Sequence, residues 1–324
     1  MPEHSLLAAD IGGTNVRLGA YQGDRLMARA QFSTKRDGAL LDLISGFAAE
    51  MDLPPEVVVV AAAGPVADNR VELTNAKQSL CGAELRAATG ASEAQIINDF
   101  AAAAWASLSP APEDLVTLQG ATTPPEGTRL VIGPGTGLGV GALARVGNSY
   151  ASVPGEGGHI GISPRSRAEV EVFEALKPIW PEIFYGDALA IEAEGMLSGT
   201  GLPYLYRAVQ SVRDGGSDAP DAAAIMQRAK SATDPVAVEV IAMFKSHLAQ
   251  VAGDLCLAFG AEGGVFLVGG VAMKNAWLFD DDFLRAFRAG GRFTEERANR
   301  SLYLLNVENF GLLGAQTYAK QLTK

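Results

Sequence analysis

Cysteine is scarce in this sequence, which has only Cys81 and Cys256, far apart along the chain. Two lone cysteines cannot make a metal cluster and argue against a disulfide framework, so each is expected to be a buried thiol. Long apolar runs are missing, since no stretch of about twenty apolar residues could cross a membrane. Residues 1–5 lead directly into an apolar segment without a basic region and cleavage site. The expectation is therefore a cytoplasmic protein.

Positive charge is also in short supply, with 26 Lys and Arg against 37 Asp and Glu and a formal net charge of −11. This balance argues against a nucleic-acid-binding surface. It does not argue against a nucleotide, because Mg²⁺ and backbone amides can hold phosphate. The length of 324 residues suffices for two modest domains. Hydrophobic and charged shares of 48% and 19% are typical of a globular enzyme.

Several familiar nucleotide motifs are absent. The chain has no Gly-Lys dipeptide, which excludes a P-loop, and no His-Arg-Asp catalytic loop of protein kinases. Residues 137–142 match the glycine spacing of a dinucleotide-binding fingerprint. The polar segment 146–150 follows where that fingerprint requires a helix, so a dehydrogenase is not favoured.

Residues 6–20 form the most informative stretch, because an apolar run ends in Asp10 and a second alternating run follows two glycines. The pattern predicts a β-hairpin with an open tip, which can hold phosphate through backbone N–H groups. Asp10 could hold hydrated Mg²⁺ beside that phosphate. The alternative is an ordinary glycine-rich hairpin. The candidate nucleotide ligands at this tip are Asp10, Gly12, Gly13, Thr14 and Asn15.

A second strand-turn-strand pattern occurs at residues 129–144. Its tip offers Gly135, Thr136 and Gly137 as a further backbone nest for phosphate. Two similar βββα halves would indicate a duplicated fold, although the similarity is too short to establish an internal repeat. Prolines and a loop-rich passage place a domain boundary near residue 110. The predicted domains are residues 1–110, completed by a C-terminal helix at about 311–324, and residues 111–310.

Hydrophobic patterning predicts the remaining elements. Gly90 is expected to end a helix. Strands are predicted at 25–34, 57–60, 71–75, 95–100, 263–271 and 302–305, and helices at 38–51, 83–89, 101–108, 242–259 and 311–322.

Asp99 is a candidate general base, because it follows a strand and opens a helix. A carboxylate there can accept a proton from a hydroxyl during phosphoryl transfer. The alternative is that Asn98 or Asp99 caps the helix, and both roles can hold together.

Glu156 and His159 stand three residues apart in the glycine-rich segment 153–161. A carboxylate and an imidazole in such a loop can accept and donate hydrogen bonds to vicinal hydroxyls. The alternative is a surface loop with a satisfied histidine, which is disfavoured because so many glycines cost conformational entropy without improving packing.

Taken together, the motifs resemble the bacterial glucokinase family of the actin/hexokinase/Hsp70-like superfamily. Each motif is weak alone, but the ordered set is specific and covers nearly the whole chain. The matching segments are 10–17, 73–75, 96–100, 133–139, 154–159, 197–199, 266–270 and 311–314.

The resemblance implies an α/β chain with a two-domain ribonuclease-H-like or actin-like ATPase fold, mixed central sheets and an active-site cleft between the domains. It also implies ATP- and Mg²⁺-dependent phosphorylation of glucose to glucose 6-phosphate, the first step of glycolysis, by a homodimer without nucleic-acid or membrane partners. By this similarity Asp99 is the base, and Gly269 and Gly270 lie near the adenosine. The implied sugar ligands are Asn75, Asn98, Asp99, Glu156, His159 and Glu194.

Three departures from the family pattern affect the sugar site. Glu192 precedes Glu194, so the assignment could slip by two residues. Gly195 and Gly161 stand where the family often has a basic and an acidic residue. The alternatives are a hexose kinase that accepts mannose, fructose or glucosamine, and a non-catalytic sugar sensor. A sensor of this kind carries a DNA-binding segment ahead of the first strand, for which no room is expected here. The zinc-binding branch of relatives is not predicted, because its cysteine cluster is missing.

Overall fold

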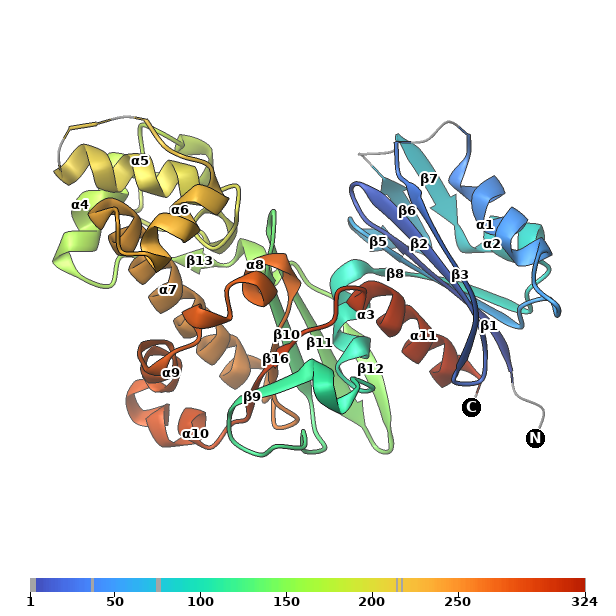
Figure 1. Cartoon of the computed structure of the whole chain (residues 1–324). Coiled ribbons are helices and arrows are strands. Elements are labelled where there is room, and N and C mark those ends of the chain that lie inside the picture. Colours follow the sequence, from blue (N-terminus) through green and yellow to red (C-terminus); the bar gives the residue numbers. More distant parts are fainter. Residues whose placement is uncertain (1–3, 36–37, 74–76, 214, 217, 324) are drawn as a thin grey trace. The chain divides into compact units, whose positions relative to one another are not determined.

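The computed structural model describes residues 4–35, 38–73, 77–213, 215–216 and 218–323 (Figure 1). Its contacts divide the chain into two compact units. Unit 1 comprises Met1–Asp114, Gly141–Pro154 and Val307–Lys324, and unit 2 comprises Leu115–Val140 and Gly155–Asn306.

Unit 1 contains a five-stranded sheet in the order β3-β2-β1-β4-β8. The pairs β1–β2 and β2–β3 are antiparallel, whereas β1–β4 and β4–β8 are parallel. This confirms the predicted hairpin, in which Asp10 pairs with Arg17. The strands are β1 (Ser5–Ile11), β2 (Asn15–Gln22), β3 (Arg25–Ser33), β4 (Val57–Ala62) and β8 (Glu93–Asn98), with a smaller antiparallel sheet of β5 (Val66–Ala67), β6 (Arg70–Leu73) and β7 (Gln78–Cys81).

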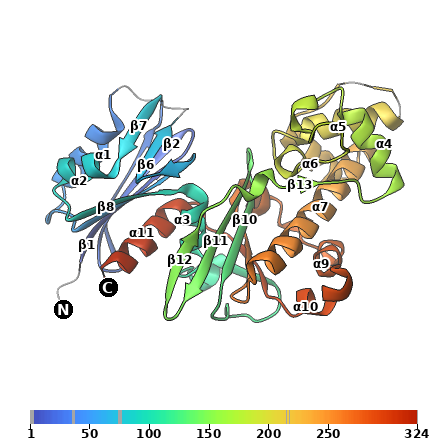
Figure 2. The same cartoon turned by 180° about the vertical axis from the view of Figure 1, so that it is seen from behind.

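Helices cover both faces of the five-stranded sheet. Since side chains alternate along a strand, Leu7 and Ala9 pack with α1 (Leu40–Ala49) and α2 (Gly82–Thr89). Leu6 and Ala8 pack on the other face with α3 (Asp99–Ala106) and α11 (Phe310–Leu322). Figure 2 shows α3 and α11 side by side beneath the strands. Two covered faces thus explain why every residue of β1 is buried.

The ends of these helices follow local chemistry. Gly90 ends α2 with φ of 74°, a left-handed conformation that glycine adopts without strain, as predicted. The predicted C-terminal helix is α11, which packs within unit 1.

The second sheet has six strands in the order β12-β11-β10-β15-β16-β9. The pairs β10–β15 and β15–β16 are parallel and β11–β12 is antiparallel. Five adjacent strands of this sheet, β12, β11, β10, β15 and β16, repeat the order of the unit 1 sheet. When the five strands of each sheet are numbered along the chain, both sheets have the order third, second, first, fourth and fifth. The strands are β9 (Leu115–Gln119), β10 (Arg129–Pro134), β11 (Leu138–Val146), β12 (Ser149–Val153), β15 (Val265–Leu267) and β16 (Leu302–Leu305), and β13 (Gly161–Ile162) pairs separately with β14 (Ile191–Glu192).

One predicted strand is wrong in extent. The strand predicted at residues 263–271 is only β15 (Val265–Leu267), and Gly269 begins helix α8 (Gly269–Lys274). Gly269 has φ of 89°, and a side chain there would lie 3.1 Å from the Pro134 carbonyl oxygen. The apolar run therefore ends in a glycine turn because the backbone must pass close to β10.

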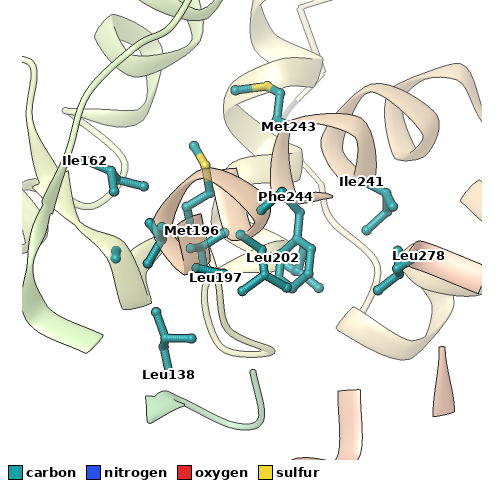
Figure 3. Packing of buried hydrophobic residues seen from close by; sticks show 14 of the residues in the cluster. Leu138, Ile162, Met196, Leu197, Leu202, Ile241, Met243, Phe244 and Leu278 are labelled. Carbon is teal, nitrogen blue, oxygen red and sulfur yellow. The ribbon is translucent and has the colours of Figure 1, made fainter. Parts of the chain in front are cut away.

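A large apolar cluster forms the core of unit 2 (Figure 3). Met196, Leu202 and Phe244 lie close together in its centre (Figure 3). Helix α7 (Pro235–Phe259) is long and apolar enough by composition to cross a membrane, but 61% of its most apolar window is buried inside the protein. We therefore interpret it as a core helix. The other helices are α4 (Arg167–Leu176), α5 (Leu202–Arg213), α6 (Ala222–Lys230), α9 (Asp281–Arg288) and α10 (Thr294–Ala298).

Candidate active site

The β1–β2 tip of unit 1 presents open backbone. The Gly12 N–H donates to the Asn15 carbonyl oxygen at 2.9 Å, and the Thr34 hydroxyl donates to the Gly12 carbonyl oxygen at 2.9 Å. A side chain at Gly12 would approach only the Asn15 carbonyl, at 3.6 Å. Gly13 and Thr14 are exposed. The turn is thus closed by its own hydrogen bonds while its outer surface stays accessible, as phosphate binding requires.

Asp10 lies buried at the base of this tip, with 9% of its surface exposed. The Arg17 guanidinium donates to its Oδ2 at 3.1 Å. Burial raises the pKa of Asp10, and the charge and hydrogen bond of Arg17 oppose that rise. Gly311 at the start of α11 comes so close that a side chain there would lie 2.5 Å from Asp10 Oδ1. Asp10 is therefore a carboxylate held in place on two sides.

Asn98 and Asp99 stand where β8 passes into α3. Asn98 caps the helix, since its Oδ1 accepts from the N–H groups of Phe100 and Ala101 at 2.8 and 3.3 Å. Its Nδ2 donates to the Gly64 carbonyl oxygen at 3.0 Å. Asp99 Oδ1 also accepts from the Phe100 N–H at 3.0 Å. The predicted cap is thus confirmed for Asn98, and it fixes the backbone that carries Asp99.

The β10–β11 tip of unit 2 is anchored by the segment before α5. The Gly135 N–H donates to the Gly137 carbonyl oxygen at 2.8 Å. The Gly199 N–H donates to the Gly135 carbonyl oxygen, and the Thr200 hydroxyl to that of Thr136, both at 2.8 Å. A side chain at Gly135 would meet only the Gly137 carbonyl, at 3.9 Å. This tip is also open on its outer side.

Gly269 and Gly270 at the start of α8 flank this second tip within unit 2. The close approach of Gly269 to the Pro134 carbonyl brings the start of α8 to the end of β10. Nothing lies within 4 Å of the position that a side chain at Gly270 would take. The space beside the tip is therefore not filled by the chain.

Glu194 ties the second tip to the helical turn Ala193–Gly195. Its Oε2 accepts from the Leu138 N–H at 2.8 Å. Gly137 has to be glycine here, because a side chain would lie 2.4 Å from that same oxygen. Glu194 thus contributes to the shape of the tip through backbone contact.

His159 lies in the short 3-10 helix Gly157–His159, with Glu156 directly before it. Both are exposed, and 49% of the His159 side chain is accessible. Glu192 Oε2 lies 2.9 Å from His159 Nδ1. This hydrogen bond raises the pKa of His159 against the opposing effect of burial, and the charges of Glu194, Glu192 and Glu156 raise it further. The two carboxylates left open by the sequence thus differ, because Glu192 contacts His159 and Glu194 contacts Leu138.

The predicted site residues fall into two sets, one in each unit. Asn75 lies outside the described residues. The sequence did not indicate the contacts of Gly311 with Asp10, of Tyr185 with His159 or of the Leu138 N–H with Glu194, because each joins residues distant in sequence. Unit 1 carries Asp10, Gly12, Gly13, Thr14, Asn15, Asn98 and Asp99, and unit 2 carries Gly135, Thr136, Gly137, Glu156, His159, Glu194, Gly269 and Gly270.

Comparison with known proteins decides the family. The glucokinase family model matches residues 7–322. The chain belongs to the glucokinase family. A glucokinase of Sinorhizobium medicae is 34% identical over 316 residues, covering 95% of this chain and 88% of that protein. The predicted enzyme class is confirmed.

Solved structures show the same fold. A glucokinase from an Antarctic psychrotroph is 27% identical, with a TM-score of 0.87 and coverage of 98% of this chain and 99% of the other. A ROK-family glucokinase from Streptomyces griseus, solved in complex with glucose and AMPPNP, is 22% identical with a TM-score of 0.62 and covers 98% and 99% of the two chains. The predicted actin-like ATPase fold of the glucokinase family is confirmed.

Proposed function

We propose that this chain transfers the γ-phosphoryl group of ATP to the 6-hydroxyl of glucose, with Asp99 as general base. The Asp99 carboxylate accepts the hydroxyl proton as the sugar oxygen bonds to phosphorus, and the bond to ADP breaks. The products are glucose 6-phosphate and ADP. The observation that carries the proposal is the strand order shared by the two sheets. Each sheet has an open glycine tip, one between β1 and β2 and the other between β10 and β11.

The two tips are suited to phosphate oxygens, which need donors rather than bulky side chains. The β- and γ-phosphates would be met by Gly12, Gly13, Thr14 and Asn15, and Thr136 with its neighbouring glycines offers a second set of backbone donors for phosphate. Gly270, where no chain atom fills the side-chain position, would lie near the adenosine. The relative from Streptomyces griseus was solved with an ATP analogue, which supports ATP as the donor.

Mg²⁺ would accompany ATP and neutralise charge on the transferred phosphate. Asp10 has the oxygen donors that this ion prefers, and it lies at the base of the first tip. Since Arg17 already donates to Oδ2, contact through water fits better than direct ligation. Among the described residues no group of three His, Cys, Asp or Glu side chains could hold a metal ion without ATP.

The sugar would be held by polar side chains. Glu156 and His159 offer an acceptor and a ring nitrogen, and Glu194 lies against the second tip. The side-chain oxygen of Asn98 accepts the hydrogen bonds of the helix cap, and one amide hydrogen is donated to the Gly64 carbonyl. The second amide hydrogen is therefore the group that can be donated to a sugar hydroxyl. We extend the proposal to Asn75 by family similarity. We also propose a cytoplasmic homodimer.

The test is ADP release from MgATP with glucose, mannose, fructose or glucosamine, against a control without sugar. We expect release that depends on glucose and exceeds that with the other hexoses. Turnover with another hexose alone would move the substrate but keep the reaction. Silence with every sugar, from protein shown to be folded by circular dichroism, would refute a kinase and favour a non-catalytic sensor.

Glu156→Gln tests the sugar site separately. The amide keeps a hydrogen-bonding group but loses the charge, so we expect the KM for glucose to rise. An unchanged KM would remove Glu156 from the site. The KM for ATP serves as the internal control.

A further inference from the structure

Glu192 is brought to His159 by a small antiparallel pair of strands. In the pairing of β13 with β14, Gly161 stands directly opposite Glu192. Opposed residues of an antiparallel pair place their side chains on the same face of the sheet. Gly161 has no side chain on that face, and the Glu192 carboxylate reaches Nδ1 of His159 at 2.9 Å.

Tyr185 reinforces this geometry. A side chain at Gly161 would lie 2.7 Å from the Tyr185 ring, so a larger residue at that position would require the ring to move. The Tyr185 hydroxyl donates to the His159 carbonyl oxygen, and the Tyr185 N–H donates to the Ala190 carbonyl oxygen at 2.9 Å. The strand that carries Glu192 and the turn that carries His159 are therefore fastened together by backbone as well as by side chain.

We propose that Glu192 is a positioning residue, which holds His159 Nδ1 and thereby presents Nε2 to a sugar hydroxyl. The proposal rests on the proposed function, because it assigns His159 to the sugar. A carboxylate can only accept, so Nδ1 must carry a proton in either charge state of the ring. The position of the ring and the identity of the nitrogen left for substrate are thus both set by Glu192.

The surroundings of His159 make its charge depend on Glu192. Three carboxylates face it, from Glu156 before the turn, Glu192 on β14 and Glu194 in the turn that follows. All three raise the pKa of His159, and the Glu192 hydrogen bond has the largest effect. Removal of Glu192 should therefore lower this pKa and loosen the ring, while Glu156 and Glu194 remain.

The pair is accessible to test because the chain has only three histidines. Proton and carbon NMR of the imidazoles follows each histidine across pH, and a His159→Asn variant identifies the His159 signal. The variants are Glu192→Ala, which removes the acceptor and the charge, and Glu192→Gln, which removes only the charge. We expect both to lower the pKa of His159.

Kinetics separates positioning from a structural role. We expect Glu192→Ala to raise the KM for glucose about tenfold with little change in kcat or in the KM for ATP, which corresponds to about 1.4 kcal/mol. Glu192→Gln should recover most of this loss, because its side-chain oxygen still accepts from Nδ1.

A matched control exists in unit 1. Glu56 Oε2 lies 2.6 Å from His4 Nδ1, and both side chains are exposed. Glu56→Ala removes that contact and should leave the His159 signal and the glucose KM unchanged. This control reports what an exposed carboxylate–imidazole pair contributes away from the sugar.

The outcomes are distinct. An unchanged His159 pKa and glucose KM in folded Glu192→Ala, with an active parent enzyme, overturn the positioning role alone. A parent protein that phosphorylates no sugar overturns the proposed function and this inference with it. A lower kcat together with higher KM values for both glucose and ATP, without recovery in Glu192→Gln, assigns Glu192 to structure and also contradicts the inference.

Discussion

Asn98→Ala should show how much the hydrogen bonds of this residue contribute to the free energy of unfolding. The substitution removes the cap of α3, which typically stabilises a protein by about 1 kcal/mol. It also removes the 3.0 Å hydrogen bond to the Gly64 carbonyl oxygen, worth about 1 kcal/mol. We therefore expect the free energy of unfolding to fall by about 2 kcal/mol, measured by urea denaturation followed by circular dichroism.

Two further variants sharpen the comparison. Asn98→Asp keeps the oxygen that accepts both cap hydrogen bonds but replaces the donor to the Gly64 carbonyl by an oxygen, so its loss should be about 1 kcal/mol or more. Asp221→Ala removes a cap at α6, where the Ala224 N–H donates to Asp221 at 2.8 Å, and should also cost about 1 kcal/mol. If Asn98→Ala lowers the free energy of unfolding by less than about 0.5 kcal/mol, the claim that these two hydrogen bonds stabilise the folded protein is refuted.

Three other properties can be measured independently. Gly314→Ala would place a side chain 1.7 Å from the Ala102 carbonyl oxygen, so we expect destabilisation of about 3 kcal/mol or more and a lower Tm by calorimetry. The pKa of Glu169 is lowered because its hydrogen bonds to His247 and to backbone outweigh burial, so its stabilising contribution is lost as pH falls through that pKa. Urea midpoints measured downward from pH 7 should therefore decline less steeply in Glu169→Gln, and parallel declines would contradict the account. Burial raises the pKa of Cys256 to about 11, so a thiol reagent at pH 8 should label at most one thiol in the folded protein and two after unfolding.

Local patterns predicted much of the fold. The β1–β2 hairpin follows from alternation around two glycines, and the end of α2 follows from Gly90. The extent of β15 was wrong, because the turn at Gly269 depends on the distant Pro134 carbonyl. Strand β9 was missed since it joins the sheet by pairing with β16, far along the chain. Pairing between distant segments has no signature within either one.

The candidate site was also predictable from local sequence patterns, but its contacts between distant segments were not. Asp99 and His159 could be selected from their own neighbourhoods, which are a strand end and a glycine-rich loop. The contact of His159 with Glu192 depends on a register between two-residue strands, so only the structure separates Glu192 from Glu194. The roles of these residues toward substrate stay predictions.

The general-base role of Asp99 is tested most directly by Asp99→Asn, with ADP release and glucose binding measured on the same protein. The amide keeps a hydrogen-bonding group but cannot take up the hydroxyl proton. We predict that glucose binding, followed by calorimetry, survives within a few-fold while turnover falls by at least about a hundredfold. Turnover comparable to that of the unaltered enzyme would contradict the mechanism proposed for this protein.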